Sequence, residues 1–239
     1  MELKLNGKKA LVTGASKGLG FGVASCLVQE GARVVINSRS EEHLIHARQM
    51  ILESTGKTVD ILAGDLADTE SATALVSKAA DMLGGLDILV TNTGGPRPGK
   101  FESMTDEDWL GAFNLLLMSH VRLIRAALPY LRQSETPSVL TMTSSSVKQP
   151  LPNLILSNSI RAATAGLTKT LSQELGREGI RFNSILPGYT DTERIQTLVK
   201  ASAAQNHTTE AQERAKLAEE VPFQRIGRVD EFAAAAVFL

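Results

Sequence analysis

The chain has 239 residues, of which 43% are hydrophobic, and a formal net charge of −1. This size suits one large α/β domain with a substantial core, and the near-neutral charge argues against nucleic acid or an anionic membrane as a partner. The single cysteine, Cys26, excludes an intrachain disulfide. No apolar run reaches the roughly 18 residues of a membrane helix, and no signal segment precedes the first predicted strand. We expect a cytoplasmic protein and assign no metal site.

Short apolar runs alternate with longer segments of helical period. Strands are predicted at Ala10–Thr13, Arg33–Asn37, Val59–Ala63, Ile88–Thr91, Ser138–Thr143 and Arg181–Leu186. Helices are predicted at Leu19–Gln29, Glu41–Glu53, Thr69–Met82, Thr105–Arg132 and Leu156–Leu175. This alternation predicts parallel strands with helices on both faces. We therefore expect a single α/β Rossmann-fold domain, a doubly wound sheet of strand order 3-2-1-4-5-6 with its ligand at the carboxyl ends of the strands.

Two later segments depart from this alternation. Thr190–Val221 is polar and helical in character and follows the sixth predicted strand at the ligand edge. We expect residues 190–221 to form a substrate lid, with a solvated helical hairpin as the alternative. Asp230–Leu239 is predicted to be an apolar helix with no strand after it, so we expect a seventh strand to be missing from this chain.

The segment from Lys9 to Gly20 is predicted to form a strand, a glycine turn and the start of a helix. The spacing of Gly14, Gly18 and Gly20 lets the backbone turn sharply and approach a ligand closely. The helix then begins with unpaired N–H groups and the positive end of its dipole, which both suit a phosphate. We place a dinucleotide pyrophosphate at Gly18–Gly20.

Motifs along essentially the whole chain resemble those of the short-chain dehydrogenase/reductases, and within them the 3-oxoacyl-carrier-protein reductase type. In chain order they are Thr13-Gly14-Ala15-Ser16-Lys17-Gly18-Leu19-Gly20, Asp65-Leu66, Thr91-Asn92-Thr93-Gly94 and Pro187-Gly188-Tyr189-Thr190-Asp191-Thr192. The resemblance implies adenine contacts at Asp65 and nicotinamide contacts near Pro187. It also implies a homodimer or homotetramer, with the long helices Thr105–Arg132 and Leu156–Leu175 packing between subunits.

The end of the second predicted strand indicates which nucleotide binds. NAD-binding proteins of this fold carry an acidic residue there to accept a hydrogen bond from the ribose 2′-OH, whereas this chain has Asn37-Ser38-Arg39. Arg39 can pair with a 2′-phosphate, Lys17 can add a second charge, and the two neutral side chains can hydrogen-bond it. We predict NADP(H), held by Gly14, Ser16, Lys17, Gly18, Leu19, Gly20, Ser38, Arg39, Asp65, Leu66, Asn92, Gly94, Arg161, Pro187, Gly188 and Thr192.

The resemblance implies hydride transfer to or from a carbonyl or alcohol, but the catalytic positions differ. The family uses a tyrosine as proton donor, a lysine four residues later, a serine that orients the substrate and an asparagine that supports a proton relay. Here Ser157 and Arg161 occupy the tyrosine and lysine positions and Leu116 the asparagine position, while Ser144, or alternatively Ser145, supplies the serine. The i,i+4 spacing keeps Ser157 and Arg161 on one helix face. Serine is a far poorer acid than a phenol, and arginine stays charged but can bind ribose hydroxyls.

Another group must therefore donate the proton if the protein is active. Candidates are Lys148 and Tyr189 in loops at the ligand edge, His120 one turn from Leu116, and a water held by Ser144 and Ser157. Ordinary loop or packing roles are the simpler interpretation of the three side chains.

Three functions remain open from the sequence. We predict an NADP(H)-dependent oxidoreductase with a non-standard proton donor that acts on a small-molecule carbonyl or alcohol. The alternatives are a catalytically silent NADP(H)-binding protein with a structural or regulatory role, and a non-redox enzyme such as a lyase or isomerase. Arg97, in the basic loop Gly94–Lys100, is a candidate contact for an anionic substrate, with a solvated loop as the simpler interpretation.

Overall fold

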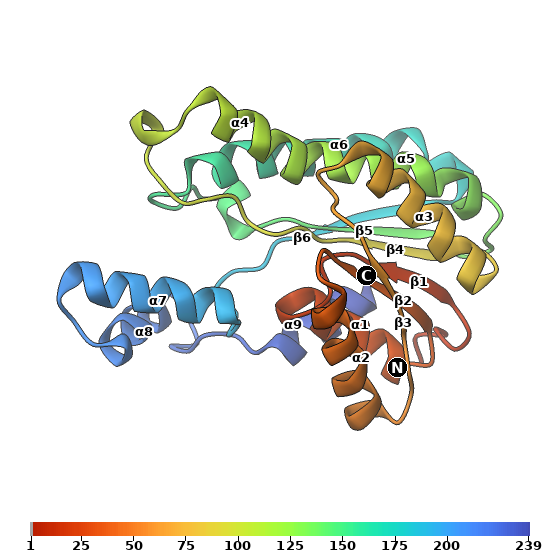
Figure 1. Ribbon diagram of the computed structural model, residues 1–239, viewed down its shortest axis with the longest axis horizontal. Coiled ribbons are helices and arrows are strands. Elements are labelled where there is room, and N and C mark those ends of the chain that lie inside the picture. Colours follow the sequence, from red (N-terminus) through yellow and green to blue (C-terminus); the bar gives the residue numbers. More distant parts are fainter. Residues whose placement is uncertain (1) are drawn as a thin grey trace.

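A computed structural model describes residues 2–239, in which a six-stranded parallel sheet lies between two layers of helices (Figure 1). The strand order is β3-β2-β1-β4-β5-β6, which confirms the predicted doubly wound topology. The strands are β1 (Lys9–Val12), β2 (Arg33–Ser38), β3 (Asp60–Ala63), β4 (Ile88–Thr91), β5 (Ser138–Met142) and β6 (Arg181–Ile185).

Side chains of the central strands alternate between two buried faces, because successive residues of a strand point in opposite directions. On β1, Ala10 and Val12 join the core beneath α1 (Gly18–Gln29), α2 (Glu41–Thr55) and α9 (Val229–Phe238). Leu11 joins the core on the other face, under α3 (Thr69–Leu83) and α5 (Ser119–Leu131). Figure 1 shows α6 (Ile155–Glu174) on the same side as α3 and α5. Within residues 2–239, no helix combines the length and apolar character needed to cross a bilayer.

The two halves of the sheet meet between β1 and β4. Val12 is paired with Ile36 of β2 on one side and with Val90 of β4 on the other, so the carboxyl ends of these strands lie side by side. The chain winds in opposite directions from this point, which opens a crevice where α/β sheets bind their ligands.

The predicted long helix Thr105–Arg132 is interrupted in the structure. It consists of α4 (Asp106–Phe113), a π-helical turn at Asn114–Met118, and α5. A π turn holds an extra residue, which displaces the helical hydrogen bonds. Here the Leu116 carbonyl accepts a hydrogen bond from Thr164 Oγ1 at 2.6 Å, which ties this turn to α6.

The predicted helical segment 190–221 forms an arm of two helices, α7 (Glu193–Asn206) and α8 (Glu210–Glu219), that extends away from the sheet (Figure 1). A capping box between Thr209 and Gln212 starts α8. The base of the arm is closed by backbone hydrogen bonds from Gly227 to Tyr189 (2.9 Å) and from Asp191 to Gly227 (2.8 Å). The arm therefore joins the domain beside the ends of the sheet strands.

Candidate functional site

The carboxyl ends of the strands open into one cavity of about 900 Å³. This volume is at the upper end of the range for small-molecule and cofactor sites. Nearly all the predicted cofactor and catalytic residues line it, namely Gly14, Ser16, Lys17, Gly18, Leu19, Ser38, Arg39, Asp65, Leu66, Asn92, Gly94, Ser144, Ser145, Ser157, Arg161, Pro187, Gly188 and Thr192. Gly20 is the exception, and it acts through the packing of the glycine turn.

The glycine turn is held in a shape that side chains would block. Gly14 has a φ of 57° in the left-handed region, and a Cβ added to Gly20 would lie 2.4 Å from the Gly14 carbonyl oxygen. Asn92 Nδ2 donates to that same oxygen at 2.9 Å. No side chain of residues 2–239 caps α1, so its first N–H groups stay available beside the cavity. These features fit a nucleotide pyrophosphate.

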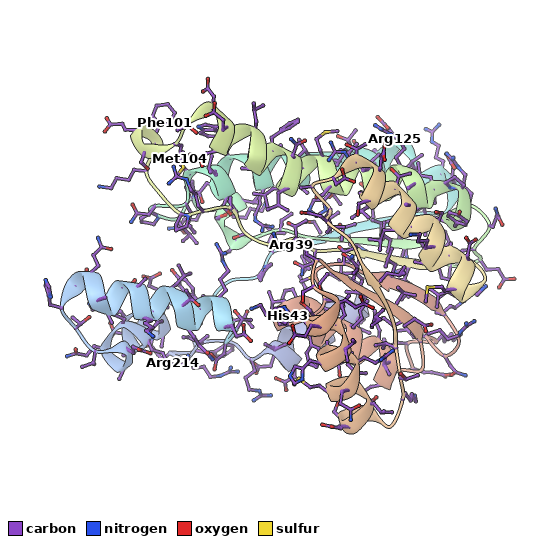
Figure 2. The ribbon with its side chains drawn as sticks, in the orientation of Figure 1. Arg39, His43, Phe101, Met104, Arg125 and Arg214 are labelled. Atoms are coloured by element: carbon purple, nitrogen blue, oxygen red, sulfur yellow. The ribbon has the colours of Figure 1, made fainter. Side chains whose placement is uncertain are left out.

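Arg39 and His43 lie together at one end of the cavity, where β2 leads into α2 (Figure 2). Arg39 is exposed, and no carboxylate of the described residues forms an ion pair with it. Ser38 also faces the cavity, whereas the buried amide of Asn37 donates to the Leu62 carbonyl at 2.9 Å. Sequence reasoning missed His43, although its place in the first turn of α2, three residues after the Ser40 cap, could have indicated it.

Lys17 lines the cavity but is not directed toward Arg39. Its ammonium lies 2.5 Å from Glu193 Oε2 at the start of α7. This ion pair connects the glycine turn to the arm. His43 is therefore a further side chain with hydrogen-bonding nitrogens at the cavity, whereas Lys17 is already paired with Glu193.

Ser144, Ser157 and Arg161 gather at the other end of the cavity. Ser144 follows β5, and its Oγ accepts from Ser146 N at 3.2 Å. Ser157 and Arg161 are one turn apart on α6 and are 6% and 8% exposed. Among residues 2–239, Ser157 Oγ forms no hydrogen bond within the protein, so both its donor and acceptor capacity remain for a ligand.

The Arg161 guanidinium is buried without a negative partner. It donates to three backbone carbonyls, those of Met142 (3.3 Å), Thr143 (3.2 Å) and Gly94 (3.4 Å). Burial, with repulsion from Arg194, lowers the pKa of Arg161 to about 10. The group is still charged at neutral pH, and it brings an uncompensated positive charge to the end of the cavity.

The proposed side-chain proton donors are disfavoured by their positions. Lys148 is exposed and does not line the cavity. His120 is fully buried away from it, with Nδ1 2.7 Å from Thr91 Oγ1, and burial lowers the pKa of His120 to about 3. Tyr189 lines the cavity, but burial and its hydrogen bond to Glu220 raise its pKa to about 12. The water held by serine hydroxyls is the route that remains.

Arg97 is not available to a substrate. It forms a two-pronged ion pair with Asp108, with distances of 2.7 and 2.6 Å, and donates to the Ser103 carbonyl at 2.6 Å. These bonds hold the pKa of the Asp108 carboxyl well below its usual range. Arg97 therefore fixes the start of α4, a role that neither the anionic-substrate hypothesis nor the solvated-loop interpretation predicted.

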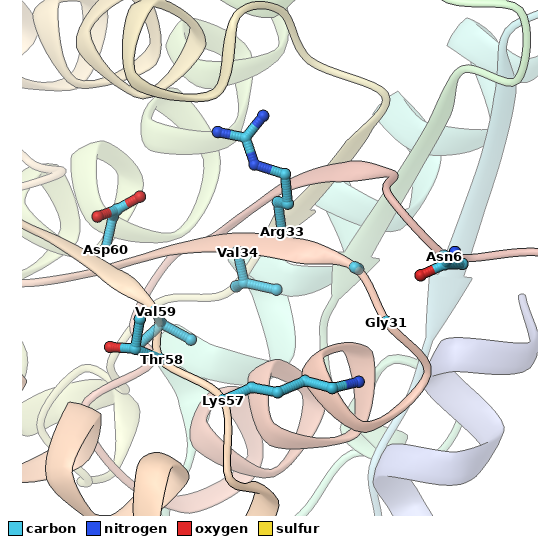
Figure 3. A pocket seen from close by; sticks show the side chains of 9 residues that line it. Asn6, Gly31, Arg33, Val34, Lys57, Thr58, Val59 and Asp60 are labelled. Atoms are coloured by element: carbon cyan, nitrogen blue, oxygen red, sulfur yellow. The ribbon is translucent and has the colours of Figure 1, made fainter.

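A smaller cavity of about 330 Å³ lies at the opposite edge of the sheet, where β2 and β3 begin (Figure 3). Its one lysine, Lys57, already donates to the Val28 carbonyl at 3.1 Å. Figure 3 shows Arg33 and Asp60 spread around the opening rather than converging on one point. The chemistry of the molecule is therefore concentrated in the large cavity.

Known proteins share this arrangement. A family model described as short chain dehydrogenase matches residues 8–203. The chain belongs to the short chain dehydrogenase family. Family membership confirms the expected Rossmann fold and makes the chain an oxidoreductase by family.

Relatives within the short chain dehydrogenase family cover nearly the whole chain. The 3-oxoacyl-[acyl-carrier-protein] reductase FabG of Chlamydia muridarum (strain MoPn / Nigg) is 29% identical over 239 residues, covering 100% of this chain and 92% of the relative. The crystal structure of L-sorbose reductase from Gluconobacter frateurii, complexed with NADPH and L-sorbose, has a TM-score of 0.94 and 31% identity, covering 100% of this chain and 91% of the other.

A third relative is described as having an unusual site. The NADPH-bound short chain oxidoreductase from Pseudomonas aeruginosa PAO1 is described as containing an atypical catalytic center. It has a TM-score of 0.86 and 29% identity, covering 96% of this chain and 88% of the other. An altered catalytic center and NADPH binding therefore occur together in a protein with this fold.

Proposed function

We propose that the chain is an NADP(H)-dependent reductase of small-molecule carbonyls, working in reverse on the corresponding alcohols, with Ser144, Ser157 and Arg161 at its reacting end. One observation carries the proposal: a single cavity joins the glycine turn and Arg39 to these three side chains. Arg39 and Ser38, with His43, suit a 2′-phosphate because no carboxylate replaces them at the end of β2. The NADPH in the two solved relatives supports the choice of nucleotide.

NADPH, when bound, supplies the hydride. The hydroxyls of Ser144 and Ser157 donate hydrogen bonds to the substrate carbonyl oxygen and hold it in place. The Arg161 charge, buried and without a negative partner, stabilises the negative charge that develops on that oxygen. A serine hydroxyl passes its proton to the alkoxide as hydride arrives and takes one from a water bound to it, and the hydroxide that remains is released to solvent.

The remaining expectations belong to the same proposal. The arm at residues 190–221 closes over the substrate as a lid, which its attachment beside the cavity supports. The protein works in the cytoplasm as a homodimer or homotetramer. Exposed apolar side chains before and along α4 support assembly, with Phe101, Leu110 and Phe113 exposed by 69%, 62% and 39%.

A silent NADP(H)-binding role is the second candidate. It is favoured by the absence of a titratable proton donor at neutral pH among the cavity residues at the Ser157 end. In that case NADPH would bind tightly and no carbonyl would be reduced.

The test measures NADPH oxidation against a panel of ketones, aldehydes and oxo acids. Ser144→Ala should lower kcat/KM by roughly 100-fold, the usual effect of losing a donor to a developing oxyanion, and Ser157→Ala should act in the same direction. The matched control Ser159→Ala changes an exposed serine of α6 and should have no effect. Tight NADPH binding with no turnover of any carbonyl would exclude the reductase and leave the silent role. In that event, Ser157→Tyr with Arg161→Lys would show whether the rest of the site can still work.

A further inference from the structure

A second arginine stands near Arg161 at the reacting end of the cavity. Arg194, in the first turn of α7, lines the same cavity. Its guanidinium lies flat against Gly95, because a Cβ added to that glycine would come within 2.4 to 2.6 Å of three guanidinium atoms. Arg161 donates to the carbonyl of the adjacent Gly94 at 3.4 Å, and the charge of Arg194 lowers the pKa of Arg161. Two guanidinium groups therefore converge on one end of the cavity.

The acidic residues around Arg194 are bound to other groups. Asp191 forms a two-pronged ion pair with Arg214, with distances of 3.0 and 2.6 Å. Glu193 pairs with Lys17 at 2.5 Å, and Glu220 accepts a hydrogen bond from Tyr189 at 3.0 Å. Among residues 2–239, no carboxylate forms an ion pair with Arg194 or with Arg161.

Arg161 is buried and Arg194 is exposed, and an anion bound between these two like charges would offset their repulsion. An arginine fork suits a planar carboxylate, which it can bind through two parallel hydrogen bonds. Leu151, Leu154 and Leu198 add apolar surface to the lining of the same cavity. The occupant that fits is a small apolar molecule with a carboxylate near its reacting carbonyl.

We propose that the substrate is a 2-oxo or 3-oxo carboxylic acid and that Arg194 binds its carboxylate while Arg161 and the serines face its carbonyl. This inference rests on the proposed reductase function and narrows its substrate class. The pyrophosphate of the nucleotide is the other anion that could reach an arginine here. Its expected place is the start of α1, where Lys17 pairs with Glu193 of the arm, whereas Arg194 lies against Gly95 in the loop after β4.

The experiment compares 2-oxohexanoate and 3-oxohexanoate with their uncharged primary amides under saturating NADPH. The wild-type protein should prefer at least one acid to its amide by roughly 10-fold or more in kcat/KM. Arg194→Gln should remove most of that preference by raising KM for the acid roughly 10- to 100-fold, as expected when a charged hydrogen-bond pair is lost. The Kd for NADPH should change less than about 3-fold. Lys200→Gln removes the same charge from an exposed position of α7 outside the cavity and should leave every value unchanged.

The other outcomes decide the inference in distinguishable ways. Equal use of acids and amides by the wild-type protein would refute it and leave the reductase function intact. Weaker NADPH binding by Arg194→Gln, with an unchanged acid preference, would assign Arg194 to the pyrophosphate. If no carbonyl is reduced, the proposed function fails, and calorimetry of 2-oxohexanoate with the NADP⁺-saturated protein decides the inference. Binding that Arg194→Gln abolishes would support the carboxylate site, and absence of binding would refute it.

Discussion

The two ends of the large cavity are built on different principles. At the nucleotide end, backbone geometry sets the shape, with Gly14 in a left-handed conformation and Gly20 packed against its carbonyl. At the reacting end, the side chains of Ser144, Ser157 and Arg161 line the cavity, and the resemblance to the family predicts a tyrosine and a lysine at two of these three positions. Because the glycine turn binds through its backbone, it can keep its shape while the side chains at the reacting end change. Nucleotide binding is therefore weaker evidence for a particular reaction than for the fold.

The largest effect should come from a substitution that disturbs the glycine turn. Gly20→Ala places a Cβ 2.4 Å from the Gly14 carbonyl oxygen, so the turn must shift. Overpacking of this kind costs about 1–3 kcal/mol, and we expect NADPH binding to weaken by up to roughly 100-fold, measured by fluorescence titration. Gly166→Ala is the control, since a Cβ there meets nothing within 4 Å. Unchanged NADPH affinity in Gly20→Ala, with an unchanged melting temperature, would show that the close packing of the glycine turn is not needed for NADPH binding.

A smaller effect should sharpen the assignment of the nucleotide. Arg39→Ala removes the exposed, unpaired charge at the end of β2 and should weaken NADPH binding roughly 10- to 100-fold, the range for a charge-assisted hydrogen bond. NADH binding should hardly change, because NADH has no 2′-phosphate. The comparison uses Arg48→Ala, on the following helix α2 but outside the cavity. If Arg39→Ala weakens the binding of NADPH and NADH equally, Arg39 does not bind the 2′-phosphate.

The smallest effect concerns stability behind the reacting end. His120 has a pKa of about 3 in the folded protein, lowered by burial and by Arg161, against about 6.5 when unfolded. Between these values the unfolded chain binds a proton that the folded protein does not, so stability falls as pH falls below 6.5. From pH 7 to pH 5 the loss from this group should be about 2 kcal/mol.

Urea unfolding at both pH values tests this prediction. His120→Asn should flatten the pH dependence by about that amount, while the exposed His46→Asn should leave it unchanged. An identical pH dependence in wild type and His120→Asn would contradict the folded-state pKa.

Much of the molecule follows from local sequence signals, and the failures have physical causes. Strand order and the nucleotide end were predictable because glycine spacing and β–α alternation act over short stretches of chain. The break between α4 and α5 was missed because a π turn barely changes the apolar pattern of Asn114–Met118. The direction of Lys17 was missed because it depends on Glu193, which is 176 residues away. Arg194 was missed because its lack of an ion-pair partner depends on two other pairs. Asp191 binds Arg214 and Glu193 binds Lys17, which the sequence does not show.

The hydrogen bond from Thr164 to the Leu116 carbonyl has a consequence for the direction of proton supply. Leu116, at the position where the resemblance predicts the family's asparagine, is buried and its carbonyl is already bound, and Thr164 and His120 are also fully buried. We infer that water reaches Ser157 through the cavity, which residues of α7 also line. The same opening would therefore admit both the substrate and the proton that completes its reduction, and closing it too early would halt turnover after hydride transfer.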